Sequence, residues 1–334
     1  MALFAVVALL PFAHAARADD GDLRVNARAA VVMDTETGKV IISKNRDVPL
    51  PQASTTKVMT AIVALEKAKL EDTYKVSANA STIPPVRVNF HTGDEVTLEA
   101  LLYSALLKSA NDAATIIAEG IGGSEEGFAR LMTLKAHEIG AVNTNYKNAS
   151  GLPADGHYST AYDMALILRY ALKDPRFQEI ATTRLATLNI GEKQKTVLRN
   201  HNRLLWSYEG AGAGKTGYTI AAKHCYVGEA NCSNKRLIVA ILGSRDLWGD
   251  AKRLLDKGFE LSANGQTLEM PDTPCPMATN AVYKVGRRHG RHGGVKAANR
   301  HGRALHKNKA KAAHKKHRRT KKKLSASNGG ASRG

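Results

Sequence analysis

The order of strand-like and helical segments constrains the fold of this chain more than any other feature. Near the start, residues 29–33 and 40–42 are β-rich runs on either side of the turn cluster DTETG, which predicts a hairpin. Far along the chain, residues 218–228 and 236–243 form two more strand-like runs joined by a polar turn. Helical patterns fill the sequence between them. Strands at both ends of a body predict an α+β fold, in which the terminal strands meet in one antiparallel sheet.

Apolar residues recur at helical spacing through the middle of the chain. The first predicted helix begins at Ser54 or Thr55, both of which are good N-terminal caps. Two buried helices are separated by the sequence KSAN at residues 108–111, which predicts a short loop between them. The predicted helices cover residues 58–65, 98–106, 113–120, 162–172 and 248–262.

Positive charge is concentrated at the end of the chain. The formal net charge is +19, and residues 284–334 contain 18 Lys or Arg and no Asp or Glu, which leaves about +1 for the rest. A near-neutral body argues against a nucleic-acid-binding core. The end has few large apolar residues and cannot bury enough surface to offset its ordering entropy. We therefore predict a proline-containing linker over residues 263–285 and a disordered basic tail over residues 286–334.

The N-terminus has the pattern of a signal peptide. Residues 2–12 form an unbroken apolar run that is too short to span a bilayer, and the small-x-small sequences AHA and ARA follow it. No Lys or Arg precedes this run, which is a departure from the usual pattern. A buried helix or strand is the alternative. We predict a signal peptide over residues 1–18 and a catalytic body over residues 19–262.

The cysteines predict neither a disulfide framework nor a metal site. There are three of them, Cys225, Cys232 and Cys275, and an odd number in an exported protein leaves at least one free thiol. If Cys225 lies in a strand, a residue seven positions along is beyond disulfide reach, so Cys225 is expected to be a core residue. No metal or other cofactor is expected in the body, and the six histidines of the tail are interpreted as incidental weak metal ligands.

Ser54 and Lys57 are the first candidate catalytic residues. They form an S-x-x-K sequence, and positions three apart share one face of a helix, so the lysine amine can reach the serine hydroxyl. A serine needs a base to become a nucleophile. A lysine becomes such a base when burial, a nearby like charge and the helix N-terminus lower its pKa. Taken alone, this short motif is common by chance.

Two further motifs supply partners for this pair. Ser109 and Asn111 form S-x-N, in which a second hydroxyl can relay a proton and an amide can bind a peptide bond. Lys215, Thr216 and Gly217 form K-T-G, placed here at the start of a strand. Lys215 and Thr216 suit a carboxylate, and Gly217 leaves room for a substrate at the strand edge. The backbone N–H of Tyr218 is expected to form an oxyanion hole with that of Ser54. A helix cap and a solvated turn are the structural alternatives.

In this order, S-x-x-K, S-x-N and K-T-G are the signature of penicillin-binding proteins and class A β-lactamases. Over about residues 25–262, the sequence resembles the low-molecular-weight penicillin-binding proteins that are D-alanyl-D-alanine carboxypeptidases. The stretches that carry the resemblance are PQASTTKVMT at 51–60, NASGL at 148–152 and GKTGYT at 214–219. The resemblance implies a β-lactamase/transpeptidase-like α+β fold. Its antiparallel five-stranded sheet is flanked by helices and carries a helical subdomain.

The resemblance also implies a role for each matching residue. Ser54 would form the acyl-enzyme, Lys57 would accept its proton and Ser109 would be the third catalytic residue. Asn111 would bind substrate, and Lys215 would bind the terminal carboxylate, with Arg245 as a candidate second cation. The implied activity is penicillin-sensitive removal of the terminal D-Ala from peptidoglycan stem peptides, in cell-wall biogenesis, without a cofactor. Its partners would be stem peptides and β-lactam antibiotics, and its location the periplasm or cell envelope.

Three other functions remain open. A D,D-endopeptidase would use the same residues on cross-linked peptides. A β-lactamase needs a deacylating glutamate before the K-T-G strand, and Asp155 is the only acid between residues 148 and 158. A cell-wall-binding protein would work mainly through its basic tail. Candidate ligands of the tail are an anionic envelope polymer and a membrane surface, whereas export argues against nucleic acid.

Overall fold

A computed structural model describes residues 23–190 and 194–271 of the chain. The predicted signal peptide, residues 1–18, and the predicted basic tail, residues 286–334, lie outside the described residues, as does Cys275. In the part of the chain that is described, no helix is both long and apolar enough to cross a bilayer.

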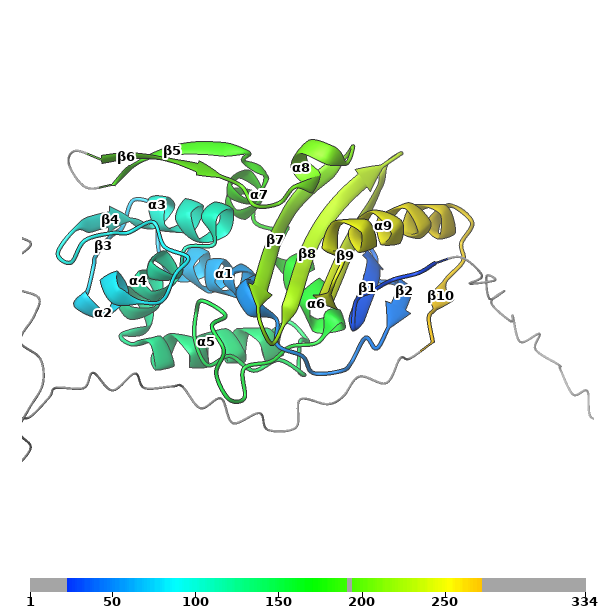
Figure 1. The fold of residues 1–334 in the computed structure, drawn as a ribbon, viewed down its shortest axis with the longest axis horizontal. Helices are drawn as coiled ribbons and strands as arrows, with labels where there is room; N and C mark the ends of the chain where they lie inside the picture. Colours follow the sequence, from blue (N-terminus) through cyan, green and yellow to red (C-terminus); the bar gives the residue numbers. More distant parts are fainter. Residues whose placement is uncertain (1–22, 191–193, 272–334) are drawn as a thin grey trace, which may run out of the picture. The chain divides into compact units, whose positions relative to one another are not determined.

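One mixed sheet forms the centre of the fold, with strand order β10-β2-β1-β9-β8-β7 (Figure 1). The N-terminal strand β1 pairs antiparallel with β9 from the far end of the body, with Val32 opposite Val239. The predicted meeting of the terminal strands is therefore confirmed. The strands of this sheet are β1 (Ala29–Asp34), β2 (Val40–Lys44), β7 (Ala211–Thr219), β8 (Lys223–Cys232), β9 (Lys235–Ser244) and β10 (Leu268–Glu269).

The sheet has a sixth strand beyond the five that were predicted. β10 is only two residues long and pairs parallel with β2, with Leu268 opposite Ile42. Met270 then donates its N–H to the Ser43 carbonyl over 2.8 Å. The folded body therefore continues to Met270, where the sequence predicted a linker from residue 263. Two residues are too few to show strand alternation, so only pairing with β2 reveals this strand.

The strand that carries K-T-G also differs from the prediction. The sequence indicated one strand over residues 218–228, but β7 ends at Thr219 and β8 begins at Lys223. Lys215 lies well inside β7 rather than at the start of a strand. Glycine has low strand propensity, so the glycine-rich start of β7 gives no local signal. Its pairing with β8 defines it instead.

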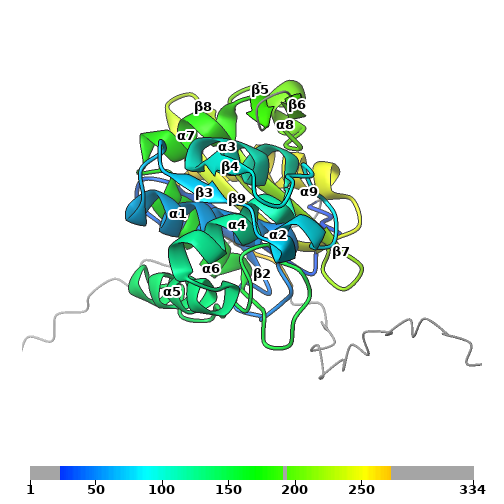
Figure 2. The ribbon, with the colours of Figure 1, turned by 90° about the vertical axis from the view of Figure 1, so that its left-hand side faces the viewer.

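Helices cover both faces of the sheet (Figures 1 and 2). Alternate residues of β1 enter two different cores: Val31 and Met33 pack with α1 and α6, whereas Val32 packs with α9. A strand buried on both faces explains why residues 29–33 are continuously apolar. The helices are α1 (Lys57–Lys67), α2 (Ala78–Thr82), α3 (Leu98–Tyr103), α4 (Asn111–Gly122), α5 (Glu125–Glu138), α6 (Ala161–Ala171), α7 (Pro175–Thr182), α8 (Leu204–Ser207) and α9 (Leu247–Ala263).

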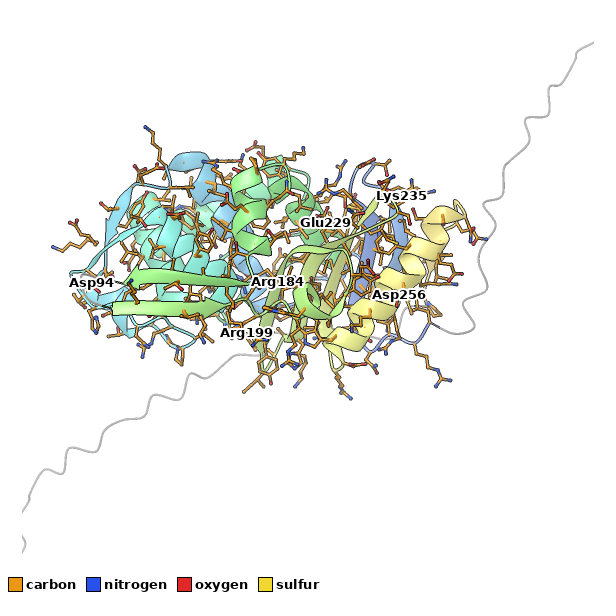
Figure 3. The ribbon with its side chains drawn as sticks, turned by 90° about the horizontal axis from the view of Figure 1, so that it is seen from above. Asp94, Arg184, Arg199, Glu229, Lys235 and Asp256 are labelled. Atoms are coloured by element: carbon orange, nitrogen blue, oxygen red, sulfur yellow. The ribbon has the colours of Figure 1, made fainter. Side chains whose placement is uncertain are left out.

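Several short elements have no counterpart in the sequence predictions. A 3₁₀ turn, η1 (Ala53–Thr56), precedes α1, and a π-helical turn, η2 (Ser104–Lys108), follows α3. Two small hairpins lie outside the main sheet. They are formed by β3 (Thr73–Lys75) with β4 (Glu95–Thr97), and by β5 (Leu185–Ile190) with β6 (Gln194–Arg199). Figure 3 looks down on the second hairpin, with Arg184 and Arg199 at one end of it.

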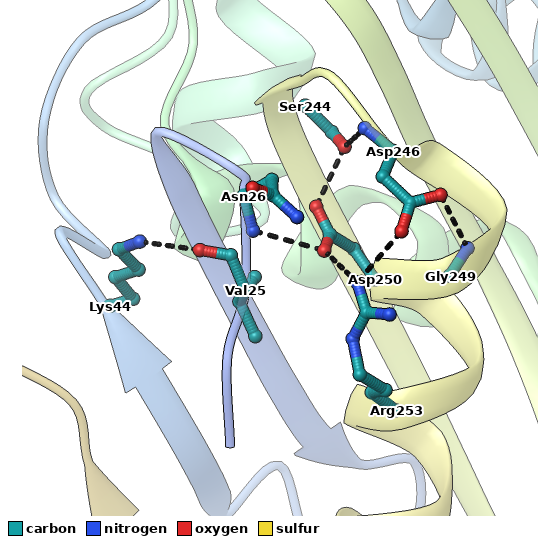
Figure 4. Close-up of polar contacts among 8 residues, drawn as sticks. All are labelled: Val25, Asn26, Lys44, Ser244, Asp246, Gly249, Asp250 and Arg253. Atoms are coloured by element: carbon teal, nitrogen blue, oxygen red, sulfur yellow. Dashed lines mark hydrogen bonds and ion pairs between the residues drawn. The ribbon is translucent and has the colours of Figure 1, made fainter. Parts of the chain in front are cut away.

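A buried carboxylate fixes the end of β9 to the start of α9 and to the segment before β1 (Figure 4). Asp250 accepts hydrogen bonds from the Ser244 hydroxyl at 2.7 Å and from the Asn26 N–H at 3.0 Å. Arg253 forms an ion pair with the same carboxylate at 2.7 Å. Because the charge is fully buried, these partners are needed to offset its desolvation. The contacts hold the turn that carries Arg245.

Candidate active site

Ser54 lies in the η1 turn, directly before α1, and is partly exposed. Ala53 has a φ of +49°, an uncommon backbone conformation for alanine. The loop of residues 148–152 packs against this turn. Gly151, with a φ of +82°, leaves no room for a side chain, because a Cβ there would collide with the Ala53 carbonyl. The sharp turn thus presents Ser54, and the glycine lets the neighbouring loop approach it.

Three groups contact the Lys57 amine. Its Nζ lies 3.2 Å from the Ser54 Oγ, 2.8 Å from the Asn111 Oδ1 and 2.6 Å from the Ser150 carbonyl oxygen. The side chain is fully buried. Among the described residues Lys57 makes no salt bridge to an acid within 4.0 Å. The predicted pairing of Ser54 with Lys57 is thus present, together with two acceptors from distant segments.

The contacts of Lys57 fit a neutral amine that accepts a proton from Ser54. Asn111 donates through its Nδ2 to the Pro84 carbonyl at 3.0 Å, which turns its Oδ1 toward Lys57. The Asn111 Oδ1 and the Ser150 carbonyl can only accept, so they take the two N–H groups of a neutral amine. The lone pair is then left for the third contact, the Ser54 hydroxyl. This is the geometry that a general base requires.

Electrostatics favour the neutral form of Lys57. Its pKa is lowered well below the ordinary lysine value, first by burial and then by the positive charge of Lys215. The buried carboxylate of Asp112 acts in the opposite direction and raises this pKa. Asp112 is already engaged, since it accepts backbone hydrogen bonds from Val88 at 3.0 Å and Asn89 at 2.8 Å. Sequence reasoning missed Asp112, although it directly follows the S-x-N motif.

Lys215 is the second buried lysine of the site. Its Nζ donates to the Ser109 Oγ at 3.0 Å and to the Thr216 carbonyl at 2.8 Å. Burial lowers the pKa of Lys215 to about 7. Ser109 connects η2 to α4 with a φ of 65°, so the loop turns sharply and brings its hydroxyl to Lys215. The structure therefore joins the S-x-N and K-T-G motifs through one hydrogen bond.

The loop of residues 148–152 is folded by its first residue. The Asn148 Oδ1 accepts from the Gly151 N–H at 2.7 Å, and its Nδ2 donates to the Leu152 carbonyl at 2.8 Å. From α1, the Thr60 hydroxyl donates to the Ala149 carbonyl at 2.7 Å. These bonds place the Ser150 carbonyl against Lys57. The NASGL stretch was recognised in the sequence, but its contact with Lys57 was not predicted.

His157 is a further residue that sequence reasoning missed. Its Nδ1 accepts from the Lys147 backbone N–H at 3.0 Å, so a neutral ring carries its proton on Nε2. Nε2 lies 2.9 Å from the Thr56 Oγ1 and donates to it in this tautomer. Burial lowers the pKa of His157 to about 4, and the charges of Lys147 and Lys57 add to this effect. The imidazole thus links the η1 turn to the loop that contacts Lys57, and a lone histidine gave no signal of this in the sequence.

The edge of β7 forms the opposite wall of the site. A Cβ at Gly217 would lie 2.7 Å from the backbone nitrogen of Ser54, so only glycine allows this approach. Thr216 is half-buried, and Tyr218 is 56% exposed, with its ring 4.7 Å from that of His224. Arg245 is exposed directly after β9. Since Ser244 pairs with His224 and His224 with Tyr218, Arg245 lies at the same end of the sheet.

Known proteins resemble this chain over most of its length. The family model Peptidase_S11, described as D-alanyl-D-alanine carboxypeptidase, matches residues 14–246. The D-alanyl-D-alanine carboxypeptidase DacF of Bacillus subtilis is 37% identical over 76% of this chain and 68% of its own length. A D-alanyl-D-alanine endopeptidase of Pseudomonas aeruginosa is 31% identical over 68% of this chain and 75% of its own.

A solved structure shows the same fold. The D-alanyl-D-alanine carboxypeptidase of Mycobacterium tuberculosis superposes with a TM-score of 0.68 at 32% identity, covering 72% of this chain and 95% of its own. The expected β-lactamase/transpeptidase-like fold is therefore confirmed. With the family model matching well over half of the sequence, the chain belongs to the peptidase S11 family of D-alanyl-D-alanine carboxypeptidases.

Proposed function

We propose that this chain is a serine-type D-Ala-D-Ala carboxypeptidase that removes the terminal D-Ala from peptidoglycan stem peptides. The observation that carries this proposal is the arrangement around Lys57. A buried amine with two obligate acceptors directs its remaining lone pair at the Ser54 hydroxyl. The family supports the substrate, since its model and the B. subtilis relative carry the same description.

The reaction begins with transfer of the Ser54 proton to Lys57 as the Oγ attacks the carbonyl carbon of the penultimate D-Ala. The oxyanion that forms is held by the backbone N–H groups of Ser54 and Tyr218. The proton then passes from Lys57 through the Ser109 hydroxyl to the departing amine. The C–N bond breaks, free D-Ala leaves and Ser54 holds the acyl group. Water then attacks the carbonyl carbon of this ester, the C–Oγ bond breaks, the shortened peptide leaves with a new terminal carboxylate, and the Ser54 Oγ takes up a proton.

The terminal carboxylate of the substrate meets the positive groups of the other wall. Lys215 and the Thr216 hydroxyl bind it, and Arg245 at the end of β9 supplies a second cation. The substrate backbone lies along the edge of β7 at Gly217, and Asn111 contacts its amide. β-Lactam antibiotics present a similar carboxylate next to a strained amide, so they acylate the same serine.

Replacement of the nucleophile tests this proposal. The Ser54→Ala variant is expected to abolish both D-Ala release from a pentapeptide and labelling by fluorescent penicillin. Lys57→Arg, which places a permanent positive charge there and cannot accept the proton, is expected to lower the acylation rate by about 10²–10⁴-fold. Circular dichroism spectra that match the wild type serve as the folding control. D-Ala release that survives in Ser54→Ala would reject the mechanism.

A D,D-endopeptidase is the second candidate, and the relative from P. aeruginosa carries that name. Both activities use the same acylation chemistry, so the catalytic residues do not separate them. Digestion of cross-linked muropeptides does, because only an endopeptidase converts dimers to monomers. A β-lactamase is disfavoured because the stretch from residue 148 to residue 158 contains no glutamate, and its one acid, Asp155, is exposed. Rapid turnover of a chromogenic cephalosporin would restore that reading.

The location of the enzyme is proposed from the two termini. Residues 1–18 are proposed to direct export, and residues 286–334 to bind an anionic polymer of the envelope. A chain that ends after residue 271 keeps β10 and its bond to β2 but lacks the tail. It is expected to retain activity on soluble peptides and to bind isolated cell walls about tenfold less at low salt. If the shortened chain binds cell walls as well as the full-length chain does, the tail has no role in wall binding. If it keeps full activity but loses wall binding, the tail acts in binding and not in catalysis.

A further inference from the structure

The β5–β6 hairpin has an unusual outer face. In a hairpin, side chains alternate between two faces, and cross-strand partners share a face. Ala186 and Leu198 turn inward, and Leu198 is buried in the main core. The opposite face carries Leu185, which pairs with Arg199, and Val197, which pairs with Thr187. Leu185 is 60% exposed and Val197 66% exposed, where an outward face is normally polar.

Cations surround these apolar side chains. Arg184, Lys195 and Arg199 are exposed. In the described part of the chain none of the three forms a salt bridge to an acid within 4.0 Å. Figure 3 shows Arg184 and Arg199 at the same end of the hairpin, which faces the viewer. The surface is therefore positive as well as apolar.

An aromatic side chain extends this surface onto α8. Trp206 is 40% exposed, and the Arg199 guanidinium lies 4.8 Å from the centre of its ring. The stacking fixes the tryptophan beside the hairpin rather than against the core. We name the set Arg184, Leu185, Lys195, Val197, Arg199 and Trp206 the hairpin outer face.

We infer that the hairpin outer face docks on a membrane surface that contains anionic lipids. Exposed aliphatic side chains gain free energy at the boundary between headgroups and acyl chains, and tryptophan prefers that depth. Cations next to them are attracted by anionic headgroups. An anionic polymer would use the cations but leave Leu185 and Val197 in water. The combination of the two side-chain classes therefore selects a bilayer.

The hairpin outer face is connected to the active site through the backbone. After β6, the His201 N–H donates to the Leu107 carbonyl in η2 at 3.1 Å. Leu107 lies two residues before Ser109, so the hairpin and one wall of the site are held together. The face would therefore set the distance of the site from the membrane, a role separate from any contact made by the basic tail.

Trp206 provides a direct test in the full-length chain. The protein has two tryptophans, and Trp248→Phe leaves Trp206 as the only one. With vesicles of phosphatidylcholine and phosphatidylglycerol in a 3:1 ratio, we expect a blue shift of its emission and quenching by brominated acyl chains. Vesicles of phosphatidylcholine alone should give a much smaller effect. Protein that sediments with vesicles while Trp206 emission stays unchanged is bound through another region, and this result would overturn the inference, as would absence of binding.

Paired variants distinguish binding through the hairpin outer face from nonspecific binding through other exposed apolar residues. Leu185→Ser with Val197→Ser is expected to weaken vesicle partitioning about tenfold. The matched control, Leu134→Ser with Val142→Ser, removes two residues that are 66% and 63% exposed elsewhere, and should change partitioning less than twofold. Labelling by fluorescent penicillin should equal the wild type in both pairs, which shows that they fold. Equal partitioning of the two pairs would count against the inference.

Discussion

At the scale of single residues, the site depends on two buried lysines that are kept close together. Lys57 contacts Ser54, and Lys215 contacts Ser109, so each amine serves one hydroxyl. Burial disfavours the charged form of both lysines, and the positive charge of Lys215 further lowers the pKa of Lys57. The sequence predicted that a nearby like charge would lower the pKa of Lys57, and Lys215, 158 positions away, supplies that charge. It could not predict that the Ser150 carbonyl and Asn111 orient the Lys57 amine. Every residue has a backbone carbonyl, so the residue type does not reveal which carbonyl contacts the amine, and the contact with Asn111 depends on the folding of a distant segment.

Lys215→Met is expected to stabilise the fold, and to do so most at low pH. The pKa of Lys215 is about 7 in the folded chain and 10.5 when unperturbed, so between these values the unfolded chain binds more protons. Wild-type stability therefore rises with pH across that window, and the full penalty of burying the charge applies below about pH 7. The gain from Lys215→Met should be larger at pH 6 than at pH 10.

Urea unfolding at the two pH values measures this difference, with Lys67→Met, an exposed lysine of α1, as the control. The variant is also expected to lose substrate binding, since the carboxylate partner is gone. A stability gain that is independent of pH would show that Lys215 titrates normally.

At the scale of elements, the site is a junction between the η1 turn, the 148–152 loop and the edge of β7. Gly151 and Gly217 allow the two neighbours to reach the backbone beside Ser54. The need for glycine at Gly217 was anticipated for substrate access. The structure adds a second reason, which is that the strand itself must lie against the nucleophile turn. Local propensity could not locate β7, because its glycines pack tightly rather than favour a strand.

Gly151→Ala tests the junction. Both a positive φ and a collision with the Ala53 carbonyl oppose a side chain at this position. Gly93 has a φ of +94° and nothing within 4 Å of its Cβ position, so Gly93→Ala measures the cost of the backbone conformation alone. We expect Gly151→Ala to reduce the free energy of unfolding by about 2 kcal/mol more than Gly93→Ala does.

The same variant should slow acylation by fluorescent penicillin, because the loop that contacts Lys57 must move. Thermal unfolding and labelling rates are the measurements. If Gly151→Ala and Gly93→Ala reduce the free energy of unfolding equally, the 148–152 loop can move away from Ala53 without a loss of stability.

At the scale of the whole described body, the candidate site residues come from segments that are distant in the sequence and meet only in the folded chain. β1 and β9 join the two ends of the described body, and the Asp250 cluster links the end of β9 to α9 and to the segment before β1. The body extends to Met270, so residues that were assigned to a linker belong to the fold. Such boundaries depend on pairing between strands that are far apart in the sequence, and a pattern of neighbouring residues does not predict that pairing.

Asp250→Ala is expected to destabilise the body by about 3 kcal/mol or more, because it leaves buried donors without partners and frees Arg253. Asp246→Ala removes an exposed partner of the same arginine and should cost about 1 kcal/mol or less. Chemical denaturation of both variants checks the ratio. Similar costs for the two would show that the buried carboxylate contributes no more than the exposed one.

The sequence by itself determined the family of this protein, its candidate site residues and the order of its main elements. Three motifs identified Ser54, Lys57, Ser109, Asn111 and Lys215 because their residue types and spacings are visible in the sequence, whereas the burial that lowers the pKa of both lysines is a property of the folded chain. Apolar periodicity located the main helices because it reflects contacts within a few residues. The tertiary structure alone decided the sixth strand, the extent of β7, and the roles of Asp112, Ser150 and His157. Those depend on which distant backbone groups meet in the folded chain, and that pairing is set by the packing of the whole sheet.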